Sequence, residues 1–286
     1  MKYQDIVTNV NRIIAGYSMR LTLRQIYYRL VAGGFIPNNR SNYNQLSSQL
    51  VAARERGDVD DDRIVDRSRS VADMSFDGAE GFIGACRSTL ETHYLRRLWD
   101  SQPFYVEVWV EKDALSQVIA NAVDGFNTVV APSRGYSSYS YLMEAANRIK
   151  TYGQGKQPVI LHFADHDPSG LDMSRDLQDR LNRYYKSAPS ITVVRIALTF
   201  NQVNSFNLTP NPVKAADGRS PAYVEKYGDK CWELDAIEPS QLLQICQGAV
   251  AKCIVNLEEW ESLKAEDEQE RSSLTSQLEA LLRGAQ

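Results

Sequence analysis

Two stretches of the sequence are most informative about the fold: Leu161-His-Phe-Ala-Asp-His-Asp-Pro-Ser-Gly170 and the earlier run Tyr105-Val-Glu-Val-Trp-Val-Glu111. Each contains a short apolar, β-branched or aromatic run that predicts a buried strand, and each has carboxylates where that strand stops. In an open α/β sheet, ligands bind at the carboxyl ends of the strands. We therefore expect Glu111, Asp165 and Asp167, the acidic edge, to lie together at one end of a sheet.

The acidic edge has the chemistry of a divalent cation site. Asp165 and Asp167 are two residues apart, a spacing that points both side chains the same way on an extended chain. Hard carboxylate oxygens suit Mg²⁺, which keeps several waters and needs few protein ligands. We expect Glu111, Asp165 and Asp167 to bind Mg²⁺, with Mn²⁺ as a substitute. Alone, the Asp-His-Asp pattern also fits a solvated turn or a helix cap, but two strands that end in acids favour the metal.

Length and composition set broad bounds. A chain of 286 residues is long enough for two compact domains, and its 43% hydrophobic and 24% charged content is typical of globular proteins. No apolar run approaches the roughly 20 residues that span a bilayer, and the first residues are too polar for a signal peptide. The four cysteines show neither CxxC pairing nor matching histidines. We expect a cytoplasmic protein without a membrane partner, a disulfide or a zinc site.

The distribution of charge points to nucleic acid, although the net charge is −4. Residues 1–70 contain eleven Lys/Arg and seven Asp/Glu, whereas the remainder contains 21 and 29. Arginine forks match phosphate oxygens, and such contacts supply most non-specific DNA affinity. Alternatively, several of these arginines pair with the acids of residues 58–62. The predicted DNA-binding arginines of this part are Arg20, Arg29, Arg54, Arg56, Arg67 and Arg69.

Residues 1–72 are predicted to form a small DNA-binding helical module. Thr22 is a plausible N-cap for a helix that ends at Gly33, and a second helix, with apolar positions at helical spacing, is closed by Gly57. Ile64-Val65 is short enough for a strand before a basic turn. Helix, turn, helix and a short β element is the order of a winged helix, whose second helix enters a DNA groove.

Residues 73–103 are predicted to connect this module to a domain at 104–256. The connector contains a loop at 74–81 and a helix over 83–99, with Tyr94, Leu95 and Leu98 facing inward. In the second domain, predicted strands alternate with helices of about ten residues, which indicates a mostly parallel sheet with helices on its faces. The strands are expected at 104–111, 128–131, 158–164 and 191–198, and the helices at 113–122, 140–150 and 171–185.

A glycine-containing loop lies beside the predicted acidic edge. Arg134-Gly-Tyr136 falls between a predicted strand and the next helix, where the glycine permits close approach of the backbone and the helix N-terminus favours a phosphate. An ordinary turn with an N-cap serine explains the same residues. We include Arg134, Gly135 and Tyr136 among the predicted DNA-binding residues. Asp113 and Asp172 are reserve ligand candidates.

The C-terminal part of the sequence has weaker secondary-structure patterns. Residues 232–238 are predicted to form a last strand that leads into a helix from Pro239. Residues 257–286 contain eight Asp/Glu and three Lys/Arg, with leucines at helical spacing. They are predicted to form an acidic helical tail that is frayed or bound to a partner.

Two groups of motifs resemble one family. Thr22-Leu-Arg-Gln-Ile-Tyr-Tyr-Arg29 resembles the motif of the A subunits of type IIB topoisomerases, which include topoisomerase VI and its meiotic double-strand-break relative. In that motif an arginine precedes two aromatic residues, the second a tyrosine that attacks DNA. Glu111 and Asp165-His-Asp-Pro-Ser-Gly170 resemble the two acidic motifs of a Toprim domain, with Arg134-Gly-Tyr136 in the place of a glycine motif. The resemblance covers residues 20–240 and is closest to the compact Mini-A forms of phages, plasmids and bacteria.

The resemblance implies a CAP-like winged-helix module followed by a Toprim domain. It also implies that Tyr28 becomes linked to a DNA 5′ end. Arg24, at i−4 on the same helix face, then positions the phosphate or helps to deprotonate the tyrosine, and Glu111 doubles as acid or base on the leaving 3′ oxygen. In the family, two such centres form in a homodimer, each combining the tyrosine of one protomer with the metal site of the other.

The helix that carries Tyr27 and Tyr28 has a buried stripe defined by Leu23, Ile26 and Leu30. Tyr27 falls closer to this stripe, and Tyr28 stands on the flank of Arg24. Core packing of both tyrosines is the alternative reading of the periodicity. We expect Tyr28 to be the exposed nucleophile, and His162 and His166 to be strand-end or supporting residues.

Three hypotheses of function follow. The first is a Mg²⁺-dependent, DNA-cleaving type IIB topoisomerase A-like enzyme with a tyrosyl intermediate. The second is a hydrolytic Toprim nuclease in which Tyr28 only binds DNA, and the third is a non-catalytic DNA-binding protein. Because the chain has no P-loop, strand passage requires a separate ATPase B subunit.

Overall fold

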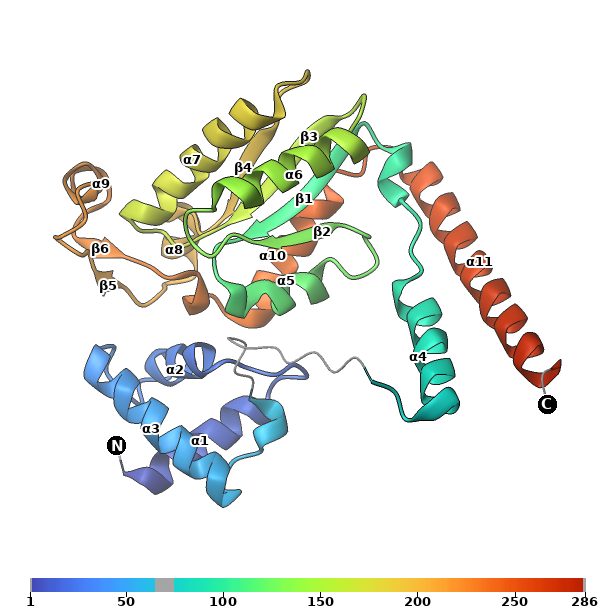
Figure 1. Cartoon of the computed structure of the whole chain (residues 1–286). Helices are drawn as coiled ribbons and strands as arrows, with labels where there is room; N and C mark the ends of the chain where they lie inside the picture. Colours follow the sequence, from blue (N-terminus) through green and yellow to red (C-terminus); the bar gives the residue numbers. More distant parts are fainter. Residues whose placement is uncertain (1, 65–74, 285–286) are drawn as a thin grey trace.

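The computed structural model describes residues 2–64 and 75–284. They form an N-terminal helical module, a larger α/β domain and an arm of two long helices that projects from that domain (Figure 1). The α/β class predicted from the sequence is confirmed.

A four-stranded, all-parallel sheet lies at the centre of the larger domain. Its strands occur in the order β2-β1-β3-β4, and β1 pairs with β3 along its whole length. The two central strands are almost entirely buried, as expected for a parallel sheet with both faces covered. The strands are β1 (Phe104–Val110), β2 (Val129–Pro132), β3 (Gln157–Phe163) and β4 (Thr192–Ala197).

Helices cover both faces of this sheet (Figure 1). Successive side chains of β1 alternate between the faces. Val106, Val108 and Val110 pack in one apolar cluster with α5 (Ser116–Ala122) and α10 (Pro239–Ala251). Tyr105 and Trp109 pack in another, with α6 (Tyr139–Tyr152) and α7 (Pro168–Tyr185). Neither face of β1 is therefore exposed to solvent.

The strand order creates a switch point between β1 and β3. The chain leaves β1 through α5 to reach β2 on one side, and leaves β3 through α7 to reach β4 on the other. The two connections lie on opposite faces of the sheet, so the loops after β1 and β3 separate and leave a crevice at their carboxyl ends. Glu111 and Asp165 stand at these two strand ends.

The N-terminal module consists of α1 (Tyr3–Ala15), α2 (Leu23–Ala32) and α3 (Arg40–Arg56). The predicted N-cap is confirmed, because Thr22 and Gln25 form a reciprocal capping box. Gly57 closes α3 in the left-handed conformation, with φ of 72°. α1 was not among the predicted elements.

The predicted β element of this module is represented by one parallel bridge between Leu21 and Ile64. No paired strands that form a wing are present in residues 2–64. Val65, the basic turn with Arg67 and Arg69, and the boundary predicted at residue 72 lie outside the described residues. The helix–turn–helix pair is thus present, and a winged helix remains a proposal.

The connector differs from its prediction. Its helix, α4 (Gly78–His93), begins earlier and ends sooner than expected, and a separate 3₁₀ turn, η2 (Leu98–Ser101), follows. Leu98 is buried as predicted, but Leu95 is exposed because the chain between the two helices is extended. The predicted single helix over 83–99 is therefore wrong.

The acidic tail is one continuous helix, α11 (Leu257–Gly284), and its partner is the connector. It runs beside α4 (Figure 1). At its base, buried Trp260 packs edge to face on Trp99, and buried Asp267 accepts a hydrogen bond of 2.6 Å from the Arg96 backbone nitrogen. Arg96 also pairs with Glu266 at 2.6 Å. Charged residues of the tail thus help to attach the arm to the domain.

Residues 198–238 form an irregular extension beside the sheet. Its bridge between His166 and Trp232 replaces the predicted strand at 232, and the following helix begins at Pro239 as predicted. The remaining short elements of the chain are η1 (Asp61–Arg63), η3 (Asp113–Leu115), α8 (Phe200–Ser205), β5 (Asn211–Pro212), α9 (Ser220–Tyr227), β6 (Lys230–Cys231) and η4 (Leu234–Ala236).

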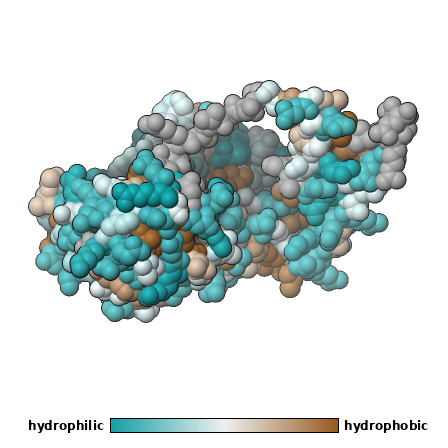
Figure 2. Space-filling model, turned by 90° about the horizontal axis from the view of Figure 1, so that it is seen from below, coloured by the Kyte–Doolittle hydropathy of each residue, from teal (hydrophilic) through white to brown (hydrophobic). Residues whose placement is uncertain are grey.

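The face seen from below is mainly hydrophilic, with apolar residues in small separate patches (Figure 2). Within the described ranges, no helix combines the length and the apolar character needed to cross a membrane.

Candidate active site

The acidic edge begins at Glu111, directly after β1. Its backbone nitrogen donates to the carbonyl of Phe163, and its Oε2 accepts a hydrogen bond of 2.9 Å from the Asp165 backbone nitrogen. Burial, followed by the Asp165 carboxylate, raises the pKa of Glu111 to about 7. The backbone donor from Asp165 and the Lys112 ammonium oppose this rise. The side chain is therefore poised to titrate near neutrality.

The two aspartates after β3 are each fixed through one oxygen. Asp165 Oδ1 accepts 2.7 Å from the Leu234 backbone nitrogen and pairs with Lys112 Nζ at 2.9 Å. Asp167 is the N-cap of α7, and its Oδ1 accepts 2.6 Å from the Gly170 nitrogen and 2.9 Å from Ser169 Oγ. The helix-cap reading of Asp167 is thus confirmed.

The residues of the acidic edge fit a hard cation in their chemistry, because all three are carboxylates. Within residues 2–64 and 75–284, no hydrogen bond uses Oδ2 of Asp165 or Asp167, or Oε1 of Glu111. Fixing one oxygen orients a carboxylate and leaves the other for a ligand. However, in the described part of the chain no three Asp, Glu, His or Cys side chains converge as a ready metal cluster. The predicted set lies at one edge but is not assembled around an ion.

Lys112 explains much of this arrangement. Its buried ammonium lies 2.9 Å from Asp165 Oδ1, 3.1 Å from Glu233 Oε2 and 2.8 Å from Asp235 Oδ2. These carboxylates hold the pKa of Lys112 above its usual value, although burial alone would lower it. The predicted site residues did not include Lys112, although it directly follows Glu111. They also lacked Glu233 and Asp235, because nothing in the local pattern brings residues 233–235 to the end of β1.

Glu233 connects the acidic edge to the N-terminal module. Arg24, on the first turn of α2, places Nε 2.8 Å from Glu233 Oε2 and Nη2 3.0 Å from Oε1. Two parallel bonds of this kind are the strongest form of arginine–carboxylate pairing. A chain of ion pairs therefore runs from α2 through Glu233 and Lys112 to Asp165.

Tyr28 is buried, and the prediction that it is exposed is wrong. Its side chain is 4% exposed, close to the 3% of Tyr27. The Tyr28 hydroxyl accepts 2.9 Å from Asn211 Nδ2 of the distant extension. Burial, and then the Glu233 carboxylate, raise the pKa of Tyr28 well above its usual value. The flank of α2 that sequence periodicity assigns to solvent is covered by residues 208–236.

Arg195, a further residue that was not predicted, lies beneath the acidic edge. Its buried guanidinium donates to the backbone carbonyls of Ala164 at 2.9 Å, Gly170 at 2.8 Å and Leu198 at 3.0 Å, and also to that of Asp165. These contacts hold the loop that carries both aspartates. The signal in the sequence was a lone arginine within the otherwise apolar strand at 191–198.

Both predicted supporting histidines are buried. His166 Nδ1 lies 2.8 Å from the Tyr223 hydroxyl within a group of aromatic rings, and burial lowers the pKa of His166 to about 4. His162 Nδ1 lies 2.9 Å from Ser174 Oγ, and burial lowers its pKa to about 3. Both rings are therefore neutral near pH 7.

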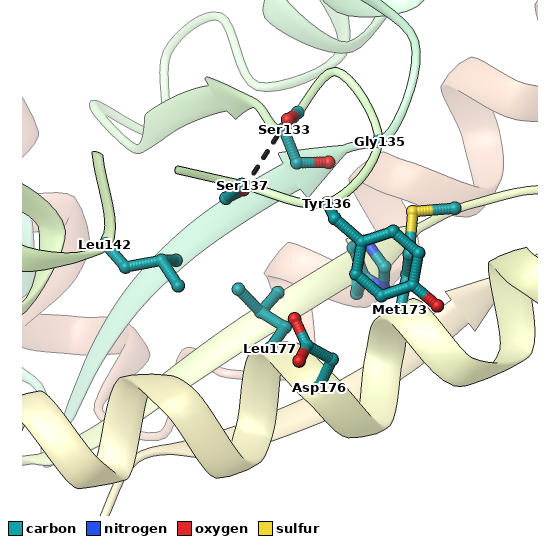
Figure 3. A pocket seen from close by; sticks show the side chains of 9 residues that line it. Ser133, Gly135, Tyr136, Ser137, Leu142, Met173, Asp176 and Leu177 are labelled. Carbon is teal, nitrogen blue, oxygen red and sulfur yellow. Dashed lines mark hydrogen bonds between the residues drawn. The ribbon is translucent and has the colours of Figure 1, made fainter. Parts of the chain in front are cut away.

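The predicted glycine loop has the backbone that its residues imply. Gly135 has a φ of 84°, a region in which glycine is favoured, and Arg134 precedes it with a φ of 50°. The loop borders a small open pocket whose wall includes Tyr136, Met173 and Asp176 (Figure 3). The Tyr136 ring extends over α7, where its hydroxyl lies 2.5 Å from Asp172 Oδ2.

The reserve ligands Asp113 and Asp172 pair with arginines. Asp113 lies 3.0 Å from Arg134, and Asp172 lies 2.7 Å from Arg175 and 3.2 Å from Arg219. Their carboxylates thus neutralise nearby guanidinium groups.

The predicted DNA-binding arginines of the N-terminal module differ in the groups that they contact. Arg20 pairs loosely with Asp62 at 3.8 Å, and Arg56 lies over the Tyr3 ring. Arg29 instead donates 2.7 Å to the Ala236 carbonyl, inside the contact between the module and the domain. In this state Arg29 is therefore part of the joint.

A scan against protein-family models and a search of curated proteins both found no match to this sequence.

Proposed function

We propose that this protein cleaves double-stranded DNA by Mg²⁺-dependent tyrosyl transfer, as type IIB topoisomerase A subunits do, and makes double-strand breaks as a homodimer. The observation that carries the proposal is the chain of ion pairs Arg24–Glu233–Lys112–Asp165. It connects the helix of the tyrosine motif to the acidic edge of the parallel sheet within one protomer. The proposed centre therefore forms within a protomer and differs in this from the trans centres that the resemblance implies.

In the proposed reaction, the oxygen of Tyr28 attacks a backbone phosphorus, and the bond from phosphorus to the 3′ oxygen breaks. The tyrosine loses its proton and the 3′ oxygen gains one, so the DNA 5′ end remains on the protein. Arg24 orients the phosphate, and Glu111 is proposed to exchange a proton with the leaving oxygen. When bound at Glu111, Asp165 and Asp167, Mg²⁺ stabilises charge on the transferring phosphate.

The same proposal includes a movement. Because Tyr28 is buried and its hydroxyl is covered by Asn211, DNA reaches it only when the segment around Asn211 moves away from α2. We propose that the module then binds DNA through its winged-helix-like helix pair and its exposed arginines. This proposal includes the Toprim assignment and the homodimer. It also includes a bacterial, phage or plasmid origin and a separate ATPase B subunit.

A supercoiled-plasmid assay with Mg²⁺ or Mn²⁺, stopped by denaturation, tests the proposal. We expect nicked or linear DNA that carries protein until protease is added. Tyr28→Phe should lose this product, because the ring remains while the nucleophilic oxygen is removed, whereas Tyr27→Phe should retain it. Asp165→Asn should also lose it. Protein-linked ends in Tyr28→Phe would contradict the role of Tyr28.

A hydrolytic Toprim-type nuclease is the second candidate. The burial of Tyr28 and the raised pKa of its hydroxyl favour it, because both oppose formation of a tyrosinate. This candidate predicts protein-free ends that persist in Tyr28→Phe and vanish in Asp165→Asn. DNA binding without cleavage in any variant would instead support a non-catalytic role.

A further inference from the structure

Glu233 lies between two cations that come from different parts of the chain. Arg24 of the N-terminal module contacts both of its oxygens, at 2.8 and 3.0 Å, and Lys112 of the α/β domain contacts Oε2 at 3.1 Å. A planar guanidinium fork together with a compact ammonium is also the arrangement that binds a phosphate. The carboxylate thus occupies a position whose surroundings suit an oxyanion in general.

The position lies beside the proposed nucleophile. Glu233, Arg24 and Lys112 all act electrostatically on the Tyr28 hydroxyl, and Arg24 is one helical turn before Tyr28. A phosphate held by Arg24 and Lys112 would therefore lie between Tyr28 and Asp165.

Of the three carboxylates on Lys112, Glu233 is the one that can be exchanged. The Asp235 side chain is fully buried and that of Asp165 is 10% exposed, whereas 23% of the Glu233 side chain is exposed. Contacts between the two parts of the chain also exist without Glu233. Arg29 donates to the Ala236 carbonyl, and Asn38 donates 2.8 Å to the Pro210 carbonyl.

We propose that Arg24 and Lys112 form a binding site for a DNA backbone phosphate, which the Glu233 carboxylate occupies in the free chain. The assignment of this phosphate as the one attacked by Tyr28 rests on the proposed function, but phosphate binding itself does not. Exchange of one anion for another leaves neither cation unpaired, which avoids the large cost of an uncompensated buried charge. Glu233 therefore acts as an internal competitor of DNA.

The test is equilibrium binding of a short labelled DNA duplex, measured by fluorescence anisotropy in EDTA so that cleavage plays no part. We expect Glu233→Gln to bind about tenfold more tightly than wild type at low salt, because its phosphate site is no longer filled by a charge. Glu266→Gln is the matched control, since it removes an equal charge from an arginine pair on the distant arm. It should bind like wild type.

The expected gain in DNA affinity of the Glu233→Gln variant must depend on Arg24. The double variant Arg24→Gln/Glu233→Gln should lose it, and Arg24→Gln should reduce the salt dependence of the Glu233→Gln variant by about one released counterion. Thermal melts followed by circular dichroism check that each variant is folded. If Glu233→Gln does not fold, Glu233→Asp, whose shorter side chain weakens the contact with Arg24, takes its place.

Equal affinities of wild type and Glu233→Gln would overturn the proposal, as would a gain that survives the loss of Arg24. The failure of the proposed function looks different. If no Tyr28–DNA adduct forms but the gain in binding is present and requires Arg24, the phosphate site stands and the tyrosyl-transfer mechanism falls.

Discussion

Glu111 illustrates how one residue can serve a site at a cost to the fold. It stands at the end of a buried strand, facing two other carboxylates of its own sheet edge, and its pKa is raised to about 7. A carboxylate must be ionised to hold a cation, so Mg²⁺ and a proton compete for it. At subsaturating Mg²⁺, we expect the proposed DNA-cleavage activity to rise as the pH increases through about 7. Profiles of cleavage rate against pH would measure this rise.

The same pKa predicts a change in stability. The folded chain binds the Glu111 proton more tightly than the unfolded chain, so this group destabilises the metal-free protein as the pH rises from about 4.5 to 7. We expect Glu111→Gln to raise the free energy of unfolding at pH 8 by about 1–3 kcal/mol, with little gain near pH 4.5. Urea unfolding at both pH values measures the difference. A gain of equal size at both would show that the charge of Glu111 is not its cause.

At the scale of elements, the N-terminus of α7 sets the backbone of the acidic edge. Asp167 caps the helix by accepting a hydrogen bond from the Gly170 nitrogen. Arg195 donates hydrogen bonds to the backbone carbonyls of Ala164, Asp165 and Gly170. A Cβ at residue 170 would overlap the Asp165 carbonyl oxygen and lie 3.0 Å from its carbon. The Asp-His-Asp-Pro-Ser-Gly motif therefore needs glycine for close packing of helix on loop.

Gly170→Ala should destabilise the protein by about 1–3 kcal/mol, because the clash is with backbone that cannot move without disturbing the aspartates. Gly248→Ala, within α10, is the control, since a Cβ there meets nothing within 4 Å. It should be neutral or stabilising by up to about 1 kcal/mol. Chemical denaturation compares the two. Equal effects of the variants would contradict the close-packing role of Gly170.

At the scale of the whole molecule, the arm is attached through a small apolar and ionic joint. Trp260 is 2% exposed and packs on Trp99, whose indole nitrogen donates to the Phe126 carbonyl. Beyond this joint, α11 runs along α4. The arm thus depends on its base for its direction.

Trp260→Ala should cost about 3–5 kcal/mol, the usual loss for truncating a buried aromatic residue. Leu257→Ala, at an exposed position of the same helix, should change stability by less than about 0.5 kcal/mol. Limited proteolysis would show whether α11 is released first. A cost for Trp260→Ala as small as that for Leu257→Ala would argue against the joint.

Local sequence was sufficient for most elements. The strands β1 and β3 were predicted, at 104–111 and 158–164, because their apolar runs stop at acids. The helices α2 and α3 were predicted because their caps and helical spacing agree. The carboxyl-end placement of Glu111 and Asp165 followed from the general behaviour of parallel sheets. For the strands and the capped helices, the decisive signals lie within a few residues along the chain.

Only the tertiary structure decided the state of the site. Tyr28 looked exposed because helical periodicity reports amphipathic character and says nothing of what covers the polar flank. Its cover, Asn211, is 183 residues away, and Glu233 is 209 residues from Arg24. The sequence by itself thus determined the strands, the capped helices and the acids at the sheet edge. Long-range packing decided that Lys112 and Glu233 join them, since charges distant in sequence meet only when burial brings them together and requires them to pair.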